Sequence, residues 1–475
     1  MKFSYEGHKM RTKVVEKLFA LATLFVAGMC VAQEMLPAET RSAIDKGVEE
    51  ALAKSGVPSA SIAIVKDGKL AYAKAYGIAD LSTKKPATTD MRYSVGSISK
   101  QFTAAAVMML VEEGKLSLDD KVGKFFPKLT RANEITLRQL LTMTSGYQDY
   151  WPQDYLMPEM MQPTTAQHIL DKWAGKPLDF EPGTKYQYSN TNYVIAGLIV
   201  EKASGMPIFD LLQKRVFTPL KMTSVMDIDK GRLTESDPVG YERYALGPSR
   251  PAHKEGVGWI FAAGELAMTP TDLAKWNISF MNRTLLKPES YRAMQTTVLL
   301  KNGFAPGYGL GLDVGMNQGR FFVAHTGEVM GFVASNRVWP DEKVSVVVLT
   351  NQMTSGAGQI EDCIRDVLFP PLDETARSSE GKVRKSFMEL QQGRIDRAQF
   401  TDNANAYFSD VALKDFANSL RPLGGPTEMN PGPRRMRGGF IIQSYRPTVG
   451  GKRLRISVFE TTEGKFEQFL VEPAD

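Results

Sequence analysis

Residues 93–102 read Tyr-Ser-Val-Gly-Ser-Ile-Ser-Lys-Gln-Phe, and the sequence after them has helical spacing. Apolar residues recur every three or four positions from residue 102 to residue 110, and Gly114 then suits the position just past a helix end. Ser97 and Lys100 are three residues apart, so they share a face of one helical turn. A serine becomes a nucleophile when a neighbouring base takes its proton, and a buried lysine near a helix N-terminus can be that base. We therefore interpret this stretch as a candidate Ser–Lys nucleophile pair.

The same Ser-x-x-Lys spacing occurs twice more, at Ser82 with Lys85 and at Ser379 with Lys382. For any one match, the alternative is a helix cap followed by a solvated lysine. Neither Ser82 nor Ser379 opens a patterned helix. The choice of Ser97 therefore depends on other parts of the chain.

Size and composition narrow the class of protein. A chain of 475 residues is long enough for two or three domains, and 43% hydrophobic with 23% charged residues is typical of a soluble globular protein. Residues 1–32 hold five basic and two acidic residues, which is much of the net charge of +5. Because the rest of the chain is nearly neutral, we expect no nucleic-acid partner.

The first 32 residues resemble a signal peptide. A basic start precedes an apolar run from Leu18 to Ala32, which is short for a membrane span and is followed by polar residues. Cleavage after Ala32 would leave small residues at both recognition positions, and Met29 argues against lipidation of Cys30. We predict a secreted or periplasmic bacterial protein with no stable membrane span after cleavage; a membrane anchor or a buried apolar helix is the alternative.

The remaining chain predicts two folded parts. Residues 33–370 contain amphipathic helices, a hairpin at Asp67-Gly68 and a strand-rich stretch over residues 308–350. Residues 147–165 have no periodicity and suggest a wall or a lid. Residues 371–382 read as a linker. Residues 383–475 predict helices followed by three strands, an accessory α+β domain that shapes the cleft or mediates association.

Two further motifs have residue types suited to acyl transfer. In Tyr188-Ser189-Asn190, a phenol beside a lysine can relay a proton, and Asn190 can orient the lysine or the substrate. His325-Thr326-Gly327 ends a predicted strand, where Gly327 would let substrate lie along the strand edge. The Glu328 N–H could then face the Ser97 N–H as an oxyanion hole. Taken singly, Tyr188 can be a packing residue, and His325 can be a histidine at a strand end whose ring nitrogens are hydrogen-bonded within the protein.

In this order, the three motifs resemble those of the serine β-lactamase and penicillin-binding protein superfamily. The resemblance runs from about Pro37 to Leu368. It implies an α+β fold, in which a β-lactamase-like antiparallel sheet is flanked by helices with a helical subdomain, plus a small C-terminal α+β domain. It also implies Ser97, Lys100 and Tyr188 as catalytic residues, and substrate binding by Asn190 and residues 325–328.

Within this superfamily, the tyrosine of the second motif is similar to that of class C β-lactamases, D-alanyl-D-alanine carboxypeptidases, esterases and D-aminopeptidases. Class C enzymes have lysine where this chain has His325, and Glu328 adds negative charge there. We therefore expect a serine hydrolase that acts on an ester or a D-amino-acid peptide, through an acyl-enzyme. A class C-like β-lactamase and a catalytically silent penicillin-binding or cell-wall-peptide-binding protein are the alternatives.

The implied mechanism leaves one assignment open. Ser97 attacks a carbonyl with Lys100 or an anionic Tyr188 as the base, and Tyr188, helped by Lys100 and His325, protonates the leaving group. We expect no cofactor and no metal, because His168, His253 and His325 lack ligand spacing. The expected partner is a small-molecule or peptide substrate, and the sequence leaves the oligomeric state open.

Overall fold

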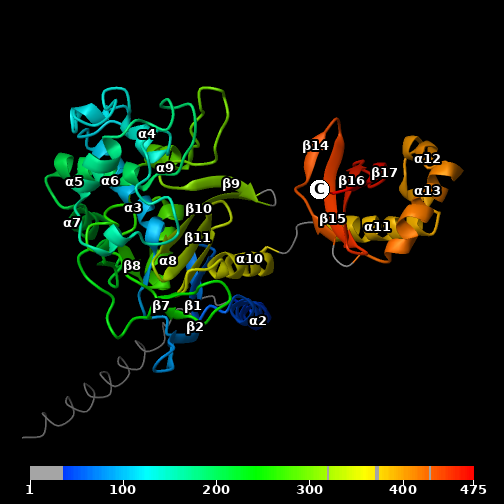
Figure 1. Cartoon of the computed structure of the whole chain (residues 1–475), viewed down its shortest axis with the longest axis horizontal. Coiled ribbons are helices and arrows are strands. Elements are labelled where there is room, and N and C mark those ends of the chain that lie inside the picture. The colour runs from blue at the N-terminus through cyan, green and yellow to red at the C-terminus, as the bar shows by residue number, and fades with distance from the viewer. Residues whose placement is uncertain (1–35, 318–319, 370–373, 427–428, 475) are drawn as a thin grey trace, which may run out of the picture. The chain divides into compact units, whose positions relative to one another are not determined.

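The computed structural model describes residues 36–317, 320–369, 374–426 and 429–474. These residues form two compact units that divide between Leu368 and Phe369, and each unit has its own hydrophobic core (Figure 1). The predicted signal peptide, residues 1–32, lies outside the described residues. Within the described part of the chain, no helix has both the length and the apolar character needed to cross a membrane.

A seven-stranded antiparallel sheet forms the centre of the first unit, in the order β3-β2-β1-β12-β11-β10-β9. The predicted Asp-Gly turn joins β1 to β2, and both turn residues have positive φ. Because β1 pairs with β12, the start and the end of the unit meet in mid-sheet. The strands are β1 (Ser59–Lys66), β2 (Lys69–Asp80), β3 (Lys85–Pro86), β9 (Asp313–Asn317), β10 (Arg320–Val329), β11 (Phe332–Trp339) and β12 (Val344–Thr350).

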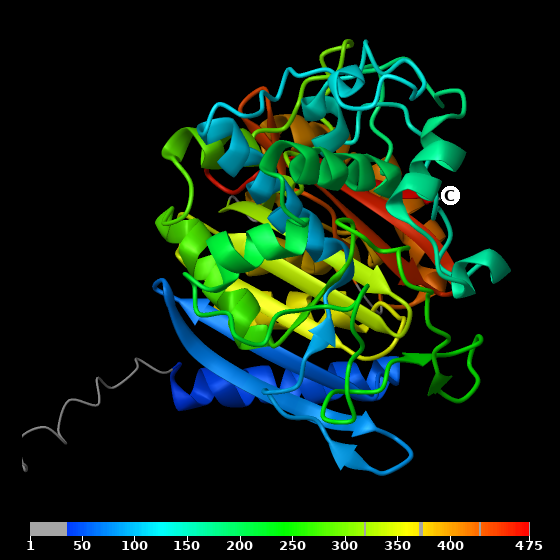
Figure 2. The same ribbon diagram turned by 90° about the vertical axis from the view of Figure 1, so that its left-hand side faces the viewer.

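Helices cover both faces of this sheet. Asn277 of α8 (Pro270–Asn282) bonds to Asn336 of β11, whereas Glu361 of α10 (Gly356–Leu368) pairs with Arg337. Successive residues of a strand face opposite sides, so α8 and α10 lie on opposite faces. Helix α2 (Ala38–Ser55) packs beside α10, and Figures 1 and 2 show the helices of residues 99–217 gathered away from α10. The layers are those of the predicted α+β fold.

The helix predicted after Ser97 is α3 (Ser99–Glu112), and it lies at the centre of the first unit. Residues 99–110 are all buried, so neighbours surround the helix on every side, although its sequence has the spacing of a one-sided helix. The other helices of this unit are α4 (Leu137–Leu141), α5 (Ala166–Ile169), α6 (Asn190–Ser204), α7 (Ile208–Leu212) and α9 (Pro288–Gln295). Short strands also occur, at β4 (Tyr93–Ser94), β5 (Met226–Asp227), β6 (Tyr241–Glu242), β7 (Arg250–Pro251) and β8 (Leu266–Met268).

The second unit places helices against an antiparallel sheet of five strands. Leu454, Ile456 and Val458 are buried, and the residues that alternate with them along the strand are more exposed, as their sequence pattern predicted. Two short strands were missed, because β13 and β14 lack an apolar alternation. The elements are α11 (Glu374–Gln391), α12 (Asp402–Tyr407), α13 (Asp410–Leu420), β13 (Met429–Pro431), β14 (Arg435–Arg437), β15 (Phe440–Val449), β16 (Lys452–Glu460) and β17 (Phe466–Pro473).

The predicted linker, residues 371–382, is wrong over most of its length. Helix α11 begins at Glu374, so residues 374–382 are helical. Residues 374–382 contain no proline, and Glu380 and Arg384 form an ion pair one helical turn apart. Ser379 is buried and donates a hydrogen bond to Glu460, which ties the helix to the sheet of its own unit.

Candidate active site

Ser97 lies in a single 3₁₀ turn, Gly96–Ile98, that runs directly into α3. Lys100 is one turn further along and is completely buried. Its Nζ lies 2.8 Å from Ser97 Oγ, within hydrogen-bond distance, so the two residues of the predicted pair are in direct contact. The other two Ser-x-x-Lys matches are not arranged in this way: Ser82 bonds to Asp80, and Ser379 bonds to Glu460.

The hydrogen-bond partners of Lys100 fix the direction of its amine. Nζ donates to Asn190 Oδ1 over 2.8 Å and to the carbonyl of Ala263 over 2.7 Å. Both of these oxygens can only accept, so together they engage the two N–H groups of a neutral amine. The lone pair of that amine then faces the Ser97 hydroxyl. Burial lowers the pKa of Lys100 to about 7, against an opposing effect of the Asp149 charge.

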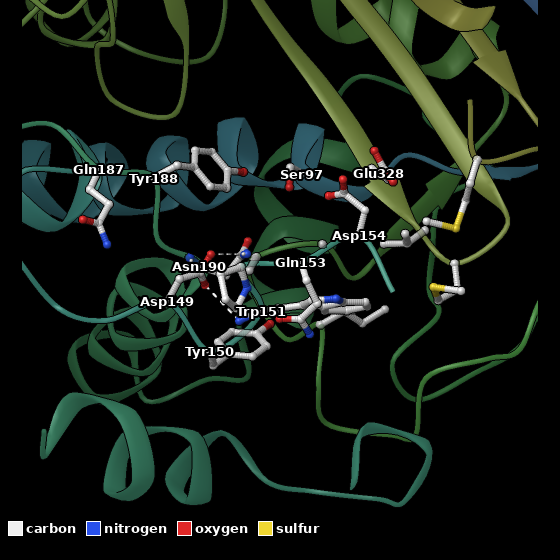
Figure 3. Close-up of a pocket in the computed structure, with 17 residues that line it drawn as sticks. Ser97, Asp149, Tyr150, Trp151, Gln153, Asp154, Gln187, Tyr188, Asn190 and Glu328 are labelled. Carbon is white, nitrogen blue, oxygen red and sulfur yellow. Dashed lines mark hydrogen bonds between the residues drawn. The ribbon is translucent and has the colours of Figure 1, made fainter. Parts of the chain in front are cut away.

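Tyr188 lies on one side of Ser97, and its hydroxyl points toward that serine (Figure 3). The Lys100 Nζ lies 5.0 Å from the centre of the Tyr188 ring. Burial raises the pKa of Tyr188 well above its usual value, and a hydrogen bond with Ser97 acts in the opposite direction. The phenol therefore keeps its proton near neutral pH and can donate it.

His325 does not face the cleft. Its Nε2 lies 2.9 Å from the Tyr308 hydroxyl, and its Nδ1 is bonded to the Thr326 carbonyl. Since a carbonyl only accepts, Nδ1 carries the proton and Nε2 accepts from Tyr308. Burial lowers the pKa of His325 to about 3, with a further contribution from Lys100. Both ring nitrogens are engaged inside the protein, so the expected contacts of His325 with substrate and leaving group do not fit this geometry.

The strand that carries the third motif lies directly against the Ser97 turn. A Cβ on Gly327 would stand 1.8 Å from the Val95 carbonyl oxygen and 3.1 Å from the Ser97 nitrogen. Gly96 has φ +50°, and a Cβ there would stand 2.6 Å from the Glu328 nitrogen. These two glycines therefore allow β10 and the turn to approach at backbone distance.

This approach places two backbone N–H groups together. The β10–β11 hairpin pairs Val329 with Phe332, which leaves Glu328 at a position without ladder hydrogen bonds to β11. The Glu328 N–H thus points away from β11, toward the turn. The Ser97 N–H belongs to the first turn of a helix, where N–H groups have no intrahelical acceptor. The pair has the arrangement of an oxyanion hole.

A cavity of about 360 Å³ opens beside Ser97 (Figure 3). Of the eight predicted site residues, Ser97, Tyr188, Asn190 and Glu328 line it, and Lys100 lies beneath. Thr326 is exposed on the same face of β10 as Glu328, and neither Thr326 nor Gly327 is among the lining residues that the structure describes.

The sequence predicted one wall of the cavity as a segment but named none of its side chains as site residues. Residues 149–154, within the stretch predicted as a wall or lid, line the cavity, and they include Asp149 and Asp154. With Glu328 they place three carboxylates around it, and no lysine or arginine is among the described lining residues. No periodicity or spacing in the sequence marks these two aspartates. Among the described residues, no group of three or more His, Cys, Asp or Glu side chains is placed to bind a metal ion.

Comparisons with known proteins agree with the predicted superfamily. The beta-lactamase family model matches residues 44–368. A D-aminopeptidase of Brucella anthropi is 31% identical over 308 residues, which cover 64% of this chain and 58% of that protein. The chain thus spans about three fifths of the length of this curated relative.

Two solved structures are similar to most of the chain. The D-stereospecific amidohydrolase from Streptomyces sp. has a TM-score of 0.60 and 28% identity, covering 70% of this chain and 98% of that chain. The D-amino acid amidase from Ochrobactrum anthropi, complexed with D-phenylalanine, has a TM-score of 0.62 and 25% identity, covering 72% and 100%. These likenesses confirm the predicted fold class.

Proposed function

The chain belongs to the beta-lactamase family, and from this premise we propose that it is a secreted serine hydrolase that cleaves amides and peptides of D-amino acids. The observation that carries the proposal is the buried Lys100 amine, which contacts Ser97 Oγ at 2.8 Å while two oxygens engage its N–H groups. The names of the amidohydrolase, amidase and aminopeptidase relatives support the D-amino-acid substrate. Secretion rests on the sequence of residues 1–32.

Lys100 is the general base of the proposed acylation step. With a pKa of about 7, a large fraction of its amine is neutral near neutral pH, whereas the raised pKa of Tyr188 keeps the phenol protonated. The amine takes the Ser97 proton as Oγ attacks the substrate carbonyl. The N–H groups of Ser97 and Glu328 then stabilise the oxyanion.

Tyr188 is the proton donor to the leaving amine. Its hydroxyl lies beside Ser97, and the Lys100 ammonium formed in the first step can return the proton to it (Figure 3). Expulsion of the amine leaves an ester on Ser97. A water molecule, deprotonated through the same pair, then attacks that ester and releases the acid.

The acidic cavity favours a substrate with a free amino group. Asp154 and Glu328 lie on the side of Ser97 opposite Tyr188 (Figure 3). Burial raises the pKa of Glu328, and repulsion by the Asp154 charge adds to this effect. If the leaving group departs toward Tyr188, the acyl part of the substrate meets these carboxylates. An α-ammonium group is attracted there, whereas the carboxylate of a β-lactam or of a peptide C-terminus is repelled.

A substrate panel tests this proposal. We expect D-alanine p-nitroanilide to be hydrolysed faster than its L enantiomer, faster than N-acetyl-D-alanine p-nitroanilide and faster than nitrocefin. In Glu328→Gln, kcat/KM for the free amine should fall about fivefold, roughly 1 kcal/mol for an exposed ion pair, and the acetylated substrate should be unaffected. Glu289→Gln, an exposed carboxylate on α9, is the matched control.

The panel also separates the alternatives. Faster turnover of nitrocefin than of every amide would support a class C-like β-lactamase instead. Equal turnover of the free and the acetylated amide would contradict the assignment of the acidic pair. No turnover of any substrate would favour the catalytically silent binding protein.

A further inference from the structure

Asp149, which lies 52 residues after Ser97 in the chain, holds the asparagine that contacts Lys100. Its Oδ1 accepts the backbone N–H of Asn190 over 2.9 Å and that of Trp151 over 3.2 Å. Its Oδ2 accepts the side-chain amide of Asn190 over 3.3 Å. One carboxylate therefore grips both the backbone and the side chain of Asn190.

This grip decides which way the Asn190 amide faces. A carboxylate only accepts, so it requires the Nδ2 group on its own side and leaves Oδ1 for Lys100. In a flipped amide, Asn190 Oδ1 would face the Asp149 carboxylate, acceptor against acceptor, and Asn190 Nδ2 would face the Lys100 amine, donor against donor. With Oδ1 in place, the neutral amine has acceptors for both N–H groups, and its lone pair stays on Ser97.

Asp149 also faces Lys100 as a charge. The other groups around the amine are the Ser97 hydroxyl and the Ala263 carbonyl, the rings of Tyr188 and Tyr193, and a neutral His325. Among the described groups, Asp149 alone raises the pKa of Lys100, against the lowering effect of burial. Without that carboxylate, the pKa of the lysine would fall further.

We propose that Asp149 is a positioning residue of the active site, which fixes the Asn190 amide so that the lone pair of Lys100 points at Ser97 and which supplies the negative charge that the lysine faces. The four residues form a chain of hydrogen bonds, Asp149–Asn190–Lys100–Ser97. The inference rests on the proposed function, because this chain matters only if Lys100 activates Ser97.

Two variants separate the geometric role of Asp149 from its charge. Asp149→Asn removes the charge and one acceptor, so kcat should fall about 10- to 100-fold, and the acidic limb of the pH profile should move to lower pH. Asp149→Glu keeps the charge but misplaces it, so kcat should fall while the limb stays where it is in the wild type. Asp171→Asn, an exposed aspartate that bonds only to Gln167 among the described residues, is the matched control.

The pH profiles are measured as kcat/KM for D-alanine p-nitroanilide and as the rate of labelling by a fluorophosphonate. The second reagent reports the reactivity of Ser97 without depending on the substrate. A double-mutant cycle with Asn190→Ala adds a second test. If Asp149 acts through Asn190, the double variant should be no slower than Asn190→Ala alone.

The outcomes separate this inference from the proposed function. An unmoved acidic limb in Asp149→Asn, or additive losses in the cycle, would overturn the positioning role and leave Ser97 and Lys100 untouched. A fully active Ser97→Ala would overturn the proposed function itself. If Asp149→Asn does not fold, Asp149→Glu and the pH profile of Asn190→Ala decide. The inference requires Asp149→Glu to be slower than the wild type while the acidic limb of its pH profile stays at the wild-type pH.

Discussion

The contact between Gly327 and the Ser97 turn gives a quantitative prediction. In Gly327→Ala the new Cβ would lie 1.8 Å from the Val95 carbonyl oxygen, whereas real Cβ atoms essentially never come closer than 3.0 Å. The strand and the turn must therefore separate by about 1.2 Å, the difference between these two distances. Both partners are backbone, so no side chain can move aside to absorb the methyl group.

That separation acts on the oxyanion hole. The Ser97 nitrogen is only 3.1 Å from the same Cβ position, and the Glu328 N–H is the next one along the strand. Loss of one oxyanion donor costs about 10²- to 10³-fold in kcat, or about 2.7–4 kcal/mol, and a misplacement of about 1 Å has a similar cost. We expect kcat/KM for D-alanine p-nitroanilide to fall by about 10²- to 10³-fold.

The assay must separate lost chemistry from lost folding. Overpacking should lower the free energy of unfolding by about 1–3 kcal/mol, which urea unfolding measures on the same sample. Gly358→Ala is the control, because a Cβ at that position in α10 meets open space; it should keep full activity and stabilise the helix by about 0.5–1 kcal/mol. A folded Gly327→Ala enzyme that keeps kcat/KM within about tenfold of wild type would refute the reasoning.

Three more predictions follow from the buried ionisable groups. The kcat/KM of the wild type should rise with pH through about 7, because Lys100 acts as a neutral base, and Lys100→Arg should be inactive at every pH because a guanidinium stays charged; a flat profile would contradict this role. Tyr308→Phe removes the donor to His325 Nε2 and should lower the free energy of unfolding by about 1–3 kcal/mol in urea, while kcat/KM stays close to wild type. Burial raises the pKa of Glu265 well above its usual value, so the folded state holds a proton that the unfolded chain releases above about pH 4.5. Stability is therefore full below that pH and falls as pH rises toward the folded pKa, by at most about 1.4 kcal/mol per pH unit. Glu265→Gln should remove this loss, and urea unfolding of the wild type and the variant at pH 5 and pH 8 measures it. If the substitution changes the free energy of unfolding equally at both pH values, Glu265 is already ionised in the folded state.

The sequence predicted the core of the site because each part has a local signal. Ser97 and Lys100 open a patterned helix, and Asn190, two residues after Tyr188, is the first residue of another. The third motif lies near the C-terminal end of β10, and its glycine is required because a Cβ there would collide with the Val95 carbonyl. The order of the three then pointed to one family, and with it to the fold.

The parts that were missed depend on contacts between distant residues. Asp149 lies in a stretch without periodicity and meets Asn190 across 41 positions of the chain. The orientation of His325 follows from strand alternation, which puts it on the face of β10 opposite Glu328 and beside Tyr308. Neither relation is visible before the strands and loops are packed together.

Errors in the second unit have a different cause. Strand β14 is basic and exposed along its whole length, so it lacks the alternation by which strands are predicted. Helix α11 begins just after two prolines in a polar stretch, which resembles a linker. In both cases, pairing with neighbouring elements decides the structure of a weakly patterned segment.

The central claim, that Ser97 is a nucleophile activated by Lys100, is tested most directly by intact-mass measurement after treatment with a fluorophosphonate. The account predicts one adduct, located on the peptide that contains Ser97, formed faster at pH 8 than at pH 6 and absent from Ser97→Ala. An adduct that persists in Ser97→Ala, or a folded wild-type protein that is never labelled, would contradict it.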